Sequence, residues 1–325
     1  MTFRQKILKK IKLYLFLVPY SLNFFSNLVN TYQKTRKILL LHQIPTKNLN
    51  KSQLEEILTI GIVCKLGSQD KYQTFKNSLN VSLFYLKKYT LKLLCADASK
   101  TVYHSKVKSL FSKKNVEYDL LHEPYTSFPL RCYKLLEKTS TEFYFMMFDD
   151  QPVIGLTPDI LTASCQLLKK YNGYLDLVLF DQNSDYIIDK TLKTISFDKN
   201  GSKLYKNKNK ILFIEKINGC QFAICVNPRY GFFFNTLIVS RQHYSRRLKW
   251  YIKNISNLSP HKIELSTANK IKRGPVFSHI AISLDAFMVD IDISPSELSV
   301  RNQLDRDSNL NISSAINDAY KIEIE

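Results

Sequence analysis

The feature that most constrains the fold is a regular alternation of apolar, strand-like runs with helix-like segments, which begins near residue 57. The strand-like runs cover 57–65, 90–97, 116–123, 142–149 and 175–181, and the helix-like segments cover 71–88, 99–114, 128–140 and 157–171. Runs that are apolar on both faces are typical of parallel strands covered by helices on both sides. The alternation therefore predicts an α/β fold with a Rossmann-type, mostly parallel sheet and helices on both faces.

Two adjacent acids, Asp149 and Asp150, end the apolar run in "EFYFMMFDDQPVIG". Neighbouring carboxylates repel each other unless a cation neutralises them. In open α/β sheets, ligands bind outside the carboxyl ends of the strands, where this pair is expected. Mg²⁺ and Mn²⁺ prefer hard oxygen ligands of this kind and bridge to substrate phosphates. The pair therefore predicts a divalent-cation site, with a solvated turn after the strand as the alternative.

Two more candidates are expected at the same edge of the sheet. Asp97 ends the second strand in "CADAS", where its carboxylate could accept hydrogen bonds from a base or ribose. Arg131 lies early in the helix 128–140, where a guanidinium could pair with a diphosphate or hold the aspartates. The alternatives are a helix-entry aspartate and a surface arginine.

The charge balance is strongly basic, because 47 Lys and Arg face 28 Asp and Glu. A net charge of +19 favours an anionic partner such as nucleic acid, an anionic lipid or a nucleotide-linked substrate. A Lys-rich compositional habit is the alternative explanation. With only 8 glycines the chain contains neither G-x-G-x-x-G nor a P-loop, which argues against a glycine-rich cofactor loop.

The six cysteines argue against a metal or disulfide framework. They are Cys64, Cys95, Cys132, Cys165, Cys220 and Cys225. Because none shows C-x-x-C spacing and the six histidines are scattered, we expect reduced, mostly buried thiols in a reducing compartment and no zinc site.

The N-terminal residues 1–57 differ from the rest, because Lys and Arg predominate and the only acids are Glu55 and Glu56. The apolar run Leu13–Tyr20 is too short to span a bilayer, and no small-residue cleavage site follows it. We expect a basic helical extension that either packs on the main domain or lies on an anionic membrane surface. An uncleaved signal anchor is the third alternative.

The remaining segments complete the expected domain organisation. A main domain covers 58–294, divided into the regular half 58–181 and a less patterned half 182–294, and 295–325 forms a polar tail or a docked helix. Residues 219–254 are expected to form one or two strands and then a basic helix. The aromatic and basic side chains of 230–253 either line an acceptor site or touch anionic lipid, or form core on one side and solvated charge on the other.

Residues 58–181 resemble the nucleotide-sugar-binding half of a GT-A-fold glycosyltransferase, of the broad inverting, family 2-like type that builds polysaccharides and glycans. "LTIGIVCKLGSQD" is similar to the first strand and loop, and "ADAS" to a D-D-G-S motif in which Asp97 matches the second acid. Arg131–Cys132 stands where the family has an Arg-Asn pair, and "FDDQ" where it has a D-x-D-like motif. The motifs depart from the family in lacking the first acid and the Gly, and in carrying Cys132 and Gln151.

The resemblance implies a metal-dependent transfer of sugar, with inversion, from a nucleoside-diphosphate sugar to a hydroxyl of a glycan or lipid-linked acceptor. It implies that Lys65, Asp97, Arg131 and Asp149 bind the nucleotide sugar and that Asp150 binds Mn²⁺ or Mg²⁺. Alternatively, Gln151 weakens metal binding. A catalytic base must deprotonate the acceptor; Glu264 is the candidate, with Asp181 as the other. His279 either reaches the metal or diphosphate, as a late His does in some relatives, or is a core histidine.

Two other functions stay open at this point. A nucleotidyltransferase also uses a metal, a diphosphate and an α/β sheet, but releases pyrophosphate. A non-catalytic basic protein would bind nucleic acid or an anionic membrane, although acids at the strand ends would repel nucleic acid, so we expect no nucleic-acid partner. We expect a cytoplasmic location, with peripheral contact to the inner face of a membrane left open.

Overall fold

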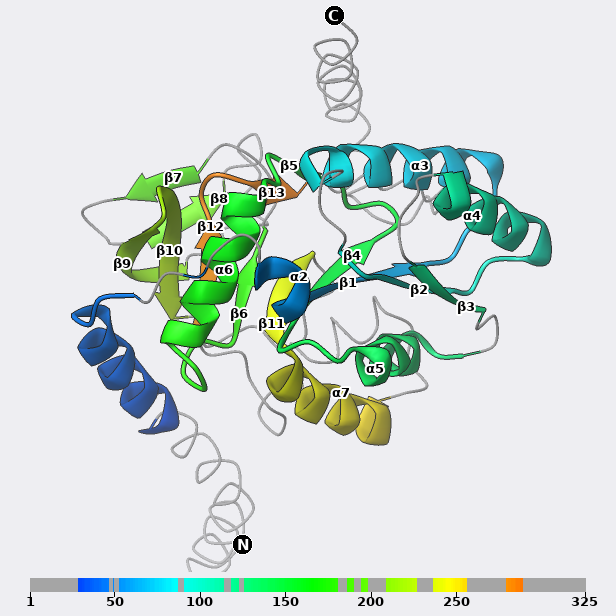
Figure 1. Cartoon of the computed structure of the whole chain (residues 1–325). Helices are drawn as coiled ribbons and strands as arrows, with labels where there is room; N and C mark the ends of the chain where they lie inside the picture. Colours follow the sequence, from blue (N-terminus) through cyan, green and yellow to red (C-terminus); the bar gives the residue numbers. More distant parts are fainter. Residues whose placement is uncertain are drawn as a thin grey trace, which may run out of the picture.

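The computed structural model describes residues 29–46, 49, 53–86, 91–113, 118–122, 126–180, 186–189, 194–197, 209–226, 236–255 and 279–288. One sheet of 11 strands, in the order β3-β2-β1-β4-β11-β6-β12-β10-β9-β8-β7, runs through the molecule (Figure 1). Its strands are β1 (Leu58–Cys64), β2 (Leu93–Asp97), β3 (Tyr118–His122), β4 (Phe143–Phe148), β6 (Leu177–Leu179), β7 (Tyr186–Asp189), β8 (Thr194–Phe197), β9 (Asn209–Ile217), β10 (Cys220–Val226), β11 (Leu237–Ser240) and β12 (His279–Ser283). A separate pair joins β5 (Val153–Ile154) to β13 (Phe287–Met288).

Strands β3, β2, β1 and β4 pair in parallel, as the alternation predicts. Every residue of β1 and β4 is buried, because helices cover both faces of this part of the sheet. The register aligns Cys64 with Asp97 and Val63 with Phe148, so three strands end at one edge. The predicted α/β class with a Rossmann-type, largely parallel central sheet is confirmed.

The other part of the sheet is mixed. Strand β11 lies antiparallel between β4 and β6, and β12 is parallel to β6. Strands β10, β9, β8 and β7 then continue in antiparallel pairs. Residues 237–240 therefore lie between two segments that precede them in the sequence, and the halves 58–181 and 182–294 share one sheet.

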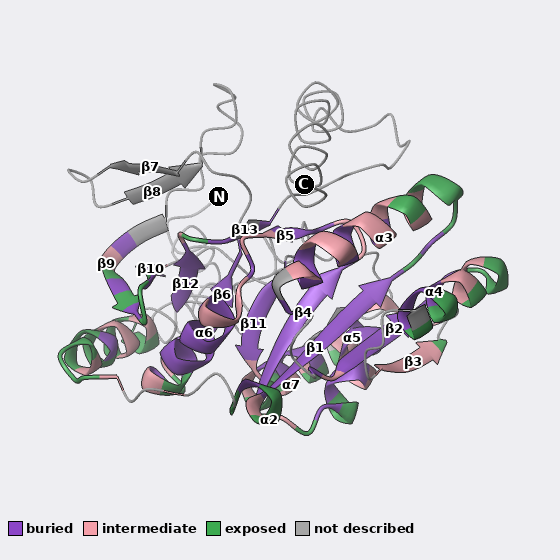
Figure 2. Ribbon diagram, turned by 45° about the horizontal axis from the view of Figure 1, so that its top comes forward, coloured by how far each residue is buried: buried purple, intermediate pink, exposed green. Residues whose placement is uncertain are grey.

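Helices cover both faces of the sheet (Figures 1 and 2). The helical elements are α2 (Leu54–Ile57), α3 (Gln69–Leu83), the 3-10 turn η2 (Phe84–Leu86), α4 (Thr101–Lys113), α5 (Phe128–Lys138), α6 (Pro158–Lys170) and α7 (Arg241–Ile255). One buried cluster joins α3, α4 and α6 to one face of β1 and β4, and a second joins α5 and α7 to the other face. Because helices cover both faces of the sheet, a ligand can reach polar side chains at the ends of the strands.

Local sequence signals explain where two helices begin. The Ser68 hydroxyl caps α3 by accepting a hydrogen bond from the backbone N–H of Lys71, at 3.3 Å. The Thr157 hydroxyl caps α6 in the same way through Ile160, also at 3.3 Å, and Pro158 follows in the first turn. A Thr followed by Pro is thus a local signal for the start of this helix.

Helix α7 is the basic helix expected in 219–254, and β10 and β11 are the expected strands. Tyr244 and Leu248 are buried, whereas Arg246 and Lys249 are exposed. The interpretation as core on one side and solvated charge on the other holds at these positions, whereas Arg247 of the same helix is buried.

The described part of the N-terminal extension includes a helix at 29–42 that packs on the main domain. Ile38 is fully buried, and Lys34 Nζ lies 3.1 Å from Asp176 Oδ1. At the far end of the helix, His42 Nδ1 lies 2.6 Å from Glu215 Oε2. The packed-extension interpretation is confirmed for this helix, whereas Leu13–Tyr20 lies outside the described residues. Within the described part of the chain, no helix combines the length and apolarity needed to cross a bilayer.

Candidate functional site

The candidate site lies where β1, β2 and β4 end. Asp149 follows β4, and its Oδ2 accepts a hydrogen bond from the backbone N–H of Lys65, which follows β1, at 3.0 Å. This bond joins the ends of two parallel strands that lie 84 residues apart in the sequence. Two of the predicted site residues are thus brought together, with Lys65 contributing its backbone.

The charge on Asp149 is only partly compensated. Burial raises the pKa of Asp149 above its usual range, against the hydrogen bond from Lys65 and the positive charges of Lys71 and Arg131. A raised pKa means that these favourable interactions do not fully offset the loss of hydration of the ionised carboxylate. A further cation beside Asp149 would favour the ionised form.

Arg131 is a buried cation in α5, with 6% of its surface exposed, so the surface-arginine alternative is wrong. Its guanidinium carbon lies 5.8 Å from the centre of the Phe128 ring, and that ring stacks on Phe148 at 5.7 Å. Its Nε has no hydrogen-bond partner among the residues that the structure describes. Burying a donor without a partner is unfavourable, so this arrangement suits an anion that supplies the missing acceptor.

The turn after β4 is tied to the middle of the sheet through Gln151, which is 8% exposed. Its side-chain oxygen accepts a hydrogen bond from the backbone N–H of Thr236 at 3.1 Å, and the Thr236 hydroxyl donates to the Gln151 carbonyl at 3.3 Å. The residue in the third position of the Asp-Asp-Gln run therefore anchors the turn to the start of β11. Asp150 lies in this turn and is partly exposed.

The donor set fits a hard divalent cation only with help from a substrate. Asp149 and Asp150 offer carboxylate oxygens, and Mg²⁺ is commonly held by one or two carboxylates with phosphates and waters in the other positions. Among the described residues, no group of three or more His, Cys, Asp or Glu side chains converges as a metal cage. The pair fits a shared metal–diphosphate site better than a dedicated protein site.

Asp97 ends β2 as predicted, but its carboxylate is fully buried and bonded within the protein. Its Oδ1 accepts hydrogen bonds from the backbone N–H of Ser99 at 2.8 Å and from the Cys64 thiol at 3.4 Å. Its Oδ2 lies 2.8 Å from Nδ1 of His104, in the first turn of α4. The carboxylate thus meets the imidazole rather than an open edge.

Two histidines that the sequence reasoning missed lie beside Asp97. The His104 ring stacks on the His122 ring, with centroids 4.1 Å apart, and His122 Nε2 lies 3.1 Å from the Ser99 carbonyl oxygen. The signal for His122 was the pairing of β2 with β3, which places it opposite Asp97. The signal for His104 was weaker, because only the turn into α4 brings it back to the strand end.

Of the remaining predicted residues, the structure describes only His279. Glu264 and Asp181 lie outside the described residues. His279 begins β12, which runs parallel to β6, so it lies at the opposite edge of the sheet. It is fully buried, and burial lowers its pKa to about 4. The core-histidine interpretation of His279 is therefore confirmed, and the metal or diphosphate role is wrong.

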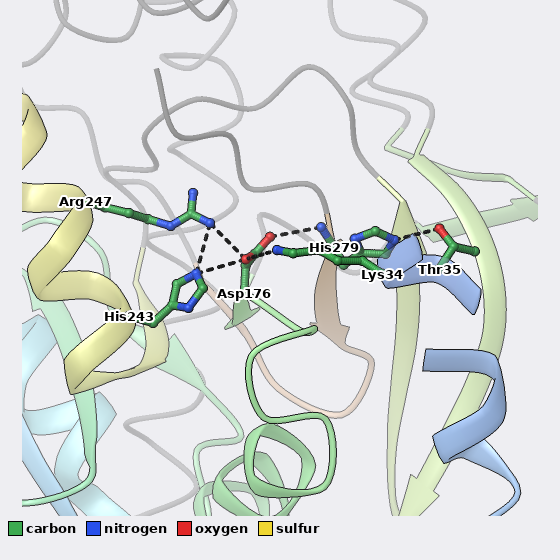
Figure 3. A network of polar contacts seen from close by, with 6 residues as sticks. All are labelled: Lys34, Thr35, Asp176, His243, Arg247 and His279. Atoms are coloured by element: carbon green, nitrogen blue, oxygen red, sulfur yellow. Dashed lines mark hydrogen bonds and ion pairs between the residues drawn. The ribbon is translucent and has the colours of Figure 1, made fainter. Parts of the chain in front are cut away.

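At that opposite edge, His279 belongs to a second buried polar cluster, shown in Figure 3. Asp176 Oδ1 accepts hydrogen bonds from Arg247 at 2.8 Å and Lys34 at 3.1 Å, and lies 3.1 Å from His243 Nε2. The Asp176 Oδ2 accepts one from the backbone N–H of His279 at 3.1 Å. The cluster joins the N-terminal helix to α7 and β12, which indicates a structural role.

No protein-family model and no curated protein matches the sequence. Similar solved structures include 4-diphosphocytidyl-2C-methyl-D-erythritol synthase from Anaerococcus prevotii, with a TM-score of 0.39 at 9% identity over 71% of this chain and 89% of that one. The TarS 1-349 fragment from S. aureus aligns with a TM-score of 0.38 at 12% identity, over 71% of this chain and 59% of that one. Mannosyltransferase PcManGT from Pyrobaculum calidifontis, in complex with GDP-Man and Mn²⁺, has a TM-score of 0.32 and covers 51% of this chain and 46% of that one. Likeness at this level carries no conclusion about family or activity.

Proposed function

We propose that this protein transfers a sugar from a nucleoside-diphosphate sugar to a hydroxyl group of a glycan or lipid-linked acceptor. The observation that carries the proposal is that Asp149, held by the Lys65 N–H, and the buried Arg131, whose positive charge acts on Asp149, belong to one strand-end site. A diphosphate needs cationic and N–H partners, and Nε of Arg131, which has no partner among the described residues, offers one of them.

The same edge explains why a divalent cation belongs in the proposal. Asp149 and Asp150 would repel a diphosphate unless a cation stood between them, and their oxygens suit Mn²⁺ or Mg²⁺. When bound, such an ion acts as a Lewis acid that stabilises negative charge on the departing nucleoside diphosphate. Arg131 and Lys71 add positive charge beside Asp149, which holds an anionic substrate in place.

For the nucleoside, we assign the contact to His104 rather than directly to Asp97. The Asp97 carboxylate is buried and holds His104 through a hydrogen bond with Nδ1. We assign the opposite ring nitrogen, Nε2, to a hydrogen bond with a nucleobase. Replacing His104 with Ala would then weaken binding of the nucleotide more than binding of pyrophosphate with Mn²⁺.

The catalytic base stays a prediction carried by Glu264, with Asp181 as the alternative. Inverting transfer requires a carboxylate near the acceptor hydroxyl to take up its proton as the oxygen attacks the anomeric carbon. A Glu264→Gln variant that still binds the donor but no longer transfers the sugar would support this role. A Glu264→Gln variant with full activity would contradict it.

The experiment that tests the function is a thermal-shift screen of UDP-, GDP- and CDP-sugars with Mn²⁺ or with EDTA. A donor that binds only the folded chain raises stability by about 2.7 kcal/mol at a hundredfold excess over Kd. We expect one donor class to stabilise the protein with Mn²⁺ and to lose this effect in Asp150→Asn. If the donor stabilises the protein equally with Mn²⁺ and with EDTA, the proposed role of the metal is wrong.

Product analysis then separates the rival activities. A glycosyltransferase releases a nucleoside diphosphate from the donor found in the screen, whereas a nucleotidyltransferase releases pyrophosphate from a nucleoside triphosphate. A non-catalytic basic protein would show neither product, no nucleotide-dependent stabilisation, and steeply salt-dependent binding to a polyanion.

A further inference from the structure

The exposed apolar side chains in the described part of the chain are concentrated on the N-terminal helix and the residues just after it. Large hydrophobic side chains that are 43–70% exposed are Val29, Tyr32, Leu39, Leu40, Ile44, Val102 and Ile214. Five of these seven lie between residues 29 and 44. Scattered exposed apolar residues are ordinary on a protein surface, but a concentration on one short segment marks an interaction site.

The packing of the helix explains which side faces outward. Lys34, Thr35, Ile38 and His42 recur at helical spacing, and each of them contacts the main domain. The opposite stripe contains Val29, Tyr32, Arg36, Leu40 and Ile44, which we call the outer face. Figure 2 shows exposed residues along this helix at the margin of the molecule. The anchors hold the helix in place and leave the outer face in solvent.

The charge of this segment indicates which partner fits the outer face. Arg36 and the neighbouring Lys37 are exposed, and no Asp or Glu occurs before Glu55. A helix with aliphatic and aromatic side chains beside basic ones lies in the interface of a membrane that contains anionic lipids. Basic residues near such a surface add electrostatic attraction to the anionic lipids.

We propose that the outer face of helix 29–42, extended by Ile44, binds the surface of a membrane containing anionic phospholipids. Nucleic acid fits less well, because phosphates offer no apolar surface to Leu40 and Ile44. A second copy of the chain, packed about a twofold axis on this face, would bring Arg36 and Lys37 against their own equivalents. The proposal is independent of the sugar-transfer activity.

The test is flotation of the full chain with phosphatidylcholine vesicles that contain or lack phosphatidylglycerol. We expect binding to the anionic vesicles, and a loss of about tenfold or more in affinity for Leu40→Ser with Ile44→Ser, because two aliphatic side chains no longer leave water. The matched control is Val102→Ser with Ile214→Ser, which removes exposed apolar side chains elsewhere and leaves affinity unchanged.

A second variant tests the charge independently. Arg36→Gln with Lys37→Gln is expected to lower affinity for anionic vesicles by roughly tenfold and to weaken its dependence on salt. Absence of binding to anionic vesicles, or equal binding by wild type and both outer-face variants, would overturn the proposal. Conversion of a wild-type dimer to a monomer by Leu40→Ser with Ile44→Ser would instead identify a second copy as the partner and also overturn it.

Discussion

At the scale of single residues, Arg131 combines a buried charge with a donor, Nε, that has no partner in the described part of the chain, an arrangement that does not favour folding. We predict that Arg131→Met leaves the free energy of unfolding unchanged or raises it, because an apolar side chain of similar length replaces a buried cation. The same variant should lose about tenfold or more in affinity for a nucleoside diphosphate with Mn²⁺.

Urea unfolding and titration calorimetry separate the two effects of this change. Arg131→Lys keeps the positive charge but not the guanidinium fork, so we expect it to recover only part of the affinity. A variant Arg131→Met that binds the nucleotide normally but unfolds more easily would show that Arg131 is structural.

Tyr144 provides a second test at this scale, on the face of β4 that α5 covers. Its ring lies against Gly61, where a Cβ would stand 1.7 Å from the Tyr144 hydroxyl oxygen, so no larger residue fits at 61 without a shift. The hydroxyl is buried without a hydrogen-bond partner among the described residues, and burial raises the pKa of Tyr144 well above its usual range.

We therefore predict that Tyr144→Phe stabilises the protein by about 1 kcal/mol, because it removes an unsatisfied buried polar group. Gly61→Ala should destabilise it strongly through the clash with the same ring. The midpoint of urea unfolding measures both changes. A less stable Tyr144→Phe would mean that the hydroxyl makes a favourable interaction.

At the scale of secondary-structure elements, Asp176 determines how the N-terminal helix, α7 and β12 are held together (Figure 3). The positive charges of Arg247 and Lys34 and the hydrogen bond with His243 overcome burial and lower the pKa of Asp176 below its usual range. The carboxylate is therefore ionised and surrounded by cations in a buried cluster.

We predict that Asp176→Asn destabilises the protein by about 3–5 kcal/mol, because it leaves buried cations without their countercharge. Asp119 is the matched control, since its ion pair with Lys138 at 3.0 Å is exposed on both sides. Asp119→Asn should change the free energy of unfolding by less than about 1 kcal/mol. Equal effects of the two variants in urea unfolding would contradict the role assigned to Asp176.

The same cluster predicts how stability depends on pH. Burial lowers the pKa of His279 to about 4, with Asp176 raising it and Lys34 lowering it further, whereas the unfolded chain has a histidine pKa of about 6.5. Between these values the unfolded chain binds a proton that the folded chain excludes. Stability should therefore fall as the pH is lowered from about 6.5 to 4, by up to about 1.4 kcal/mol per pH unit.

His279→Gln should remove that slope from a series of urea unfolding curves while leaving the slope at lower pH, where carboxylates with lowered pKa values take up protons. Asp176 and Glu215 both belong to that second group. An unchanged slope between pH 6.5 and 4 in His279→Gln would assign the dependence to other groups.

At the scale of the whole molecule, local sequence signals were informative only where contacts are local or follow from topology. The apolar runs of β1 and β4 and the cap at Thr157 could be predicted from neighbouring residues, and the meeting of Lys65 with Asp149 follows from parallel strands. The place of β11 between β4 and β6 could not, because no local feature of residues 237–240 specifies two partners far away in the sequence. The burial of Asp97 under His104 and the cation cluster around Asp176 depend on such long-range packing too.

The interleaving of the two halves leads to a prediction about folding. Residues 58–181 contain the candidate site, but β4 and β6 of this segment pair with β11, and β6 also pairs with β12, both from the second half. A fragment of residues 58–181 would expose these strand edges and the apolar surfaces that the second half covers. We expect the isolated fragment to show no cooperative unfolding transition by circular dichroism, whereas the full chain unfolds in a single cooperative transition followed by several probes. A fragment that unfolds cooperatively and binds a nucleotide with Mn²⁺ would show that the first half is an independent domain, and that β11 contributes to the sheet without being needed to form it.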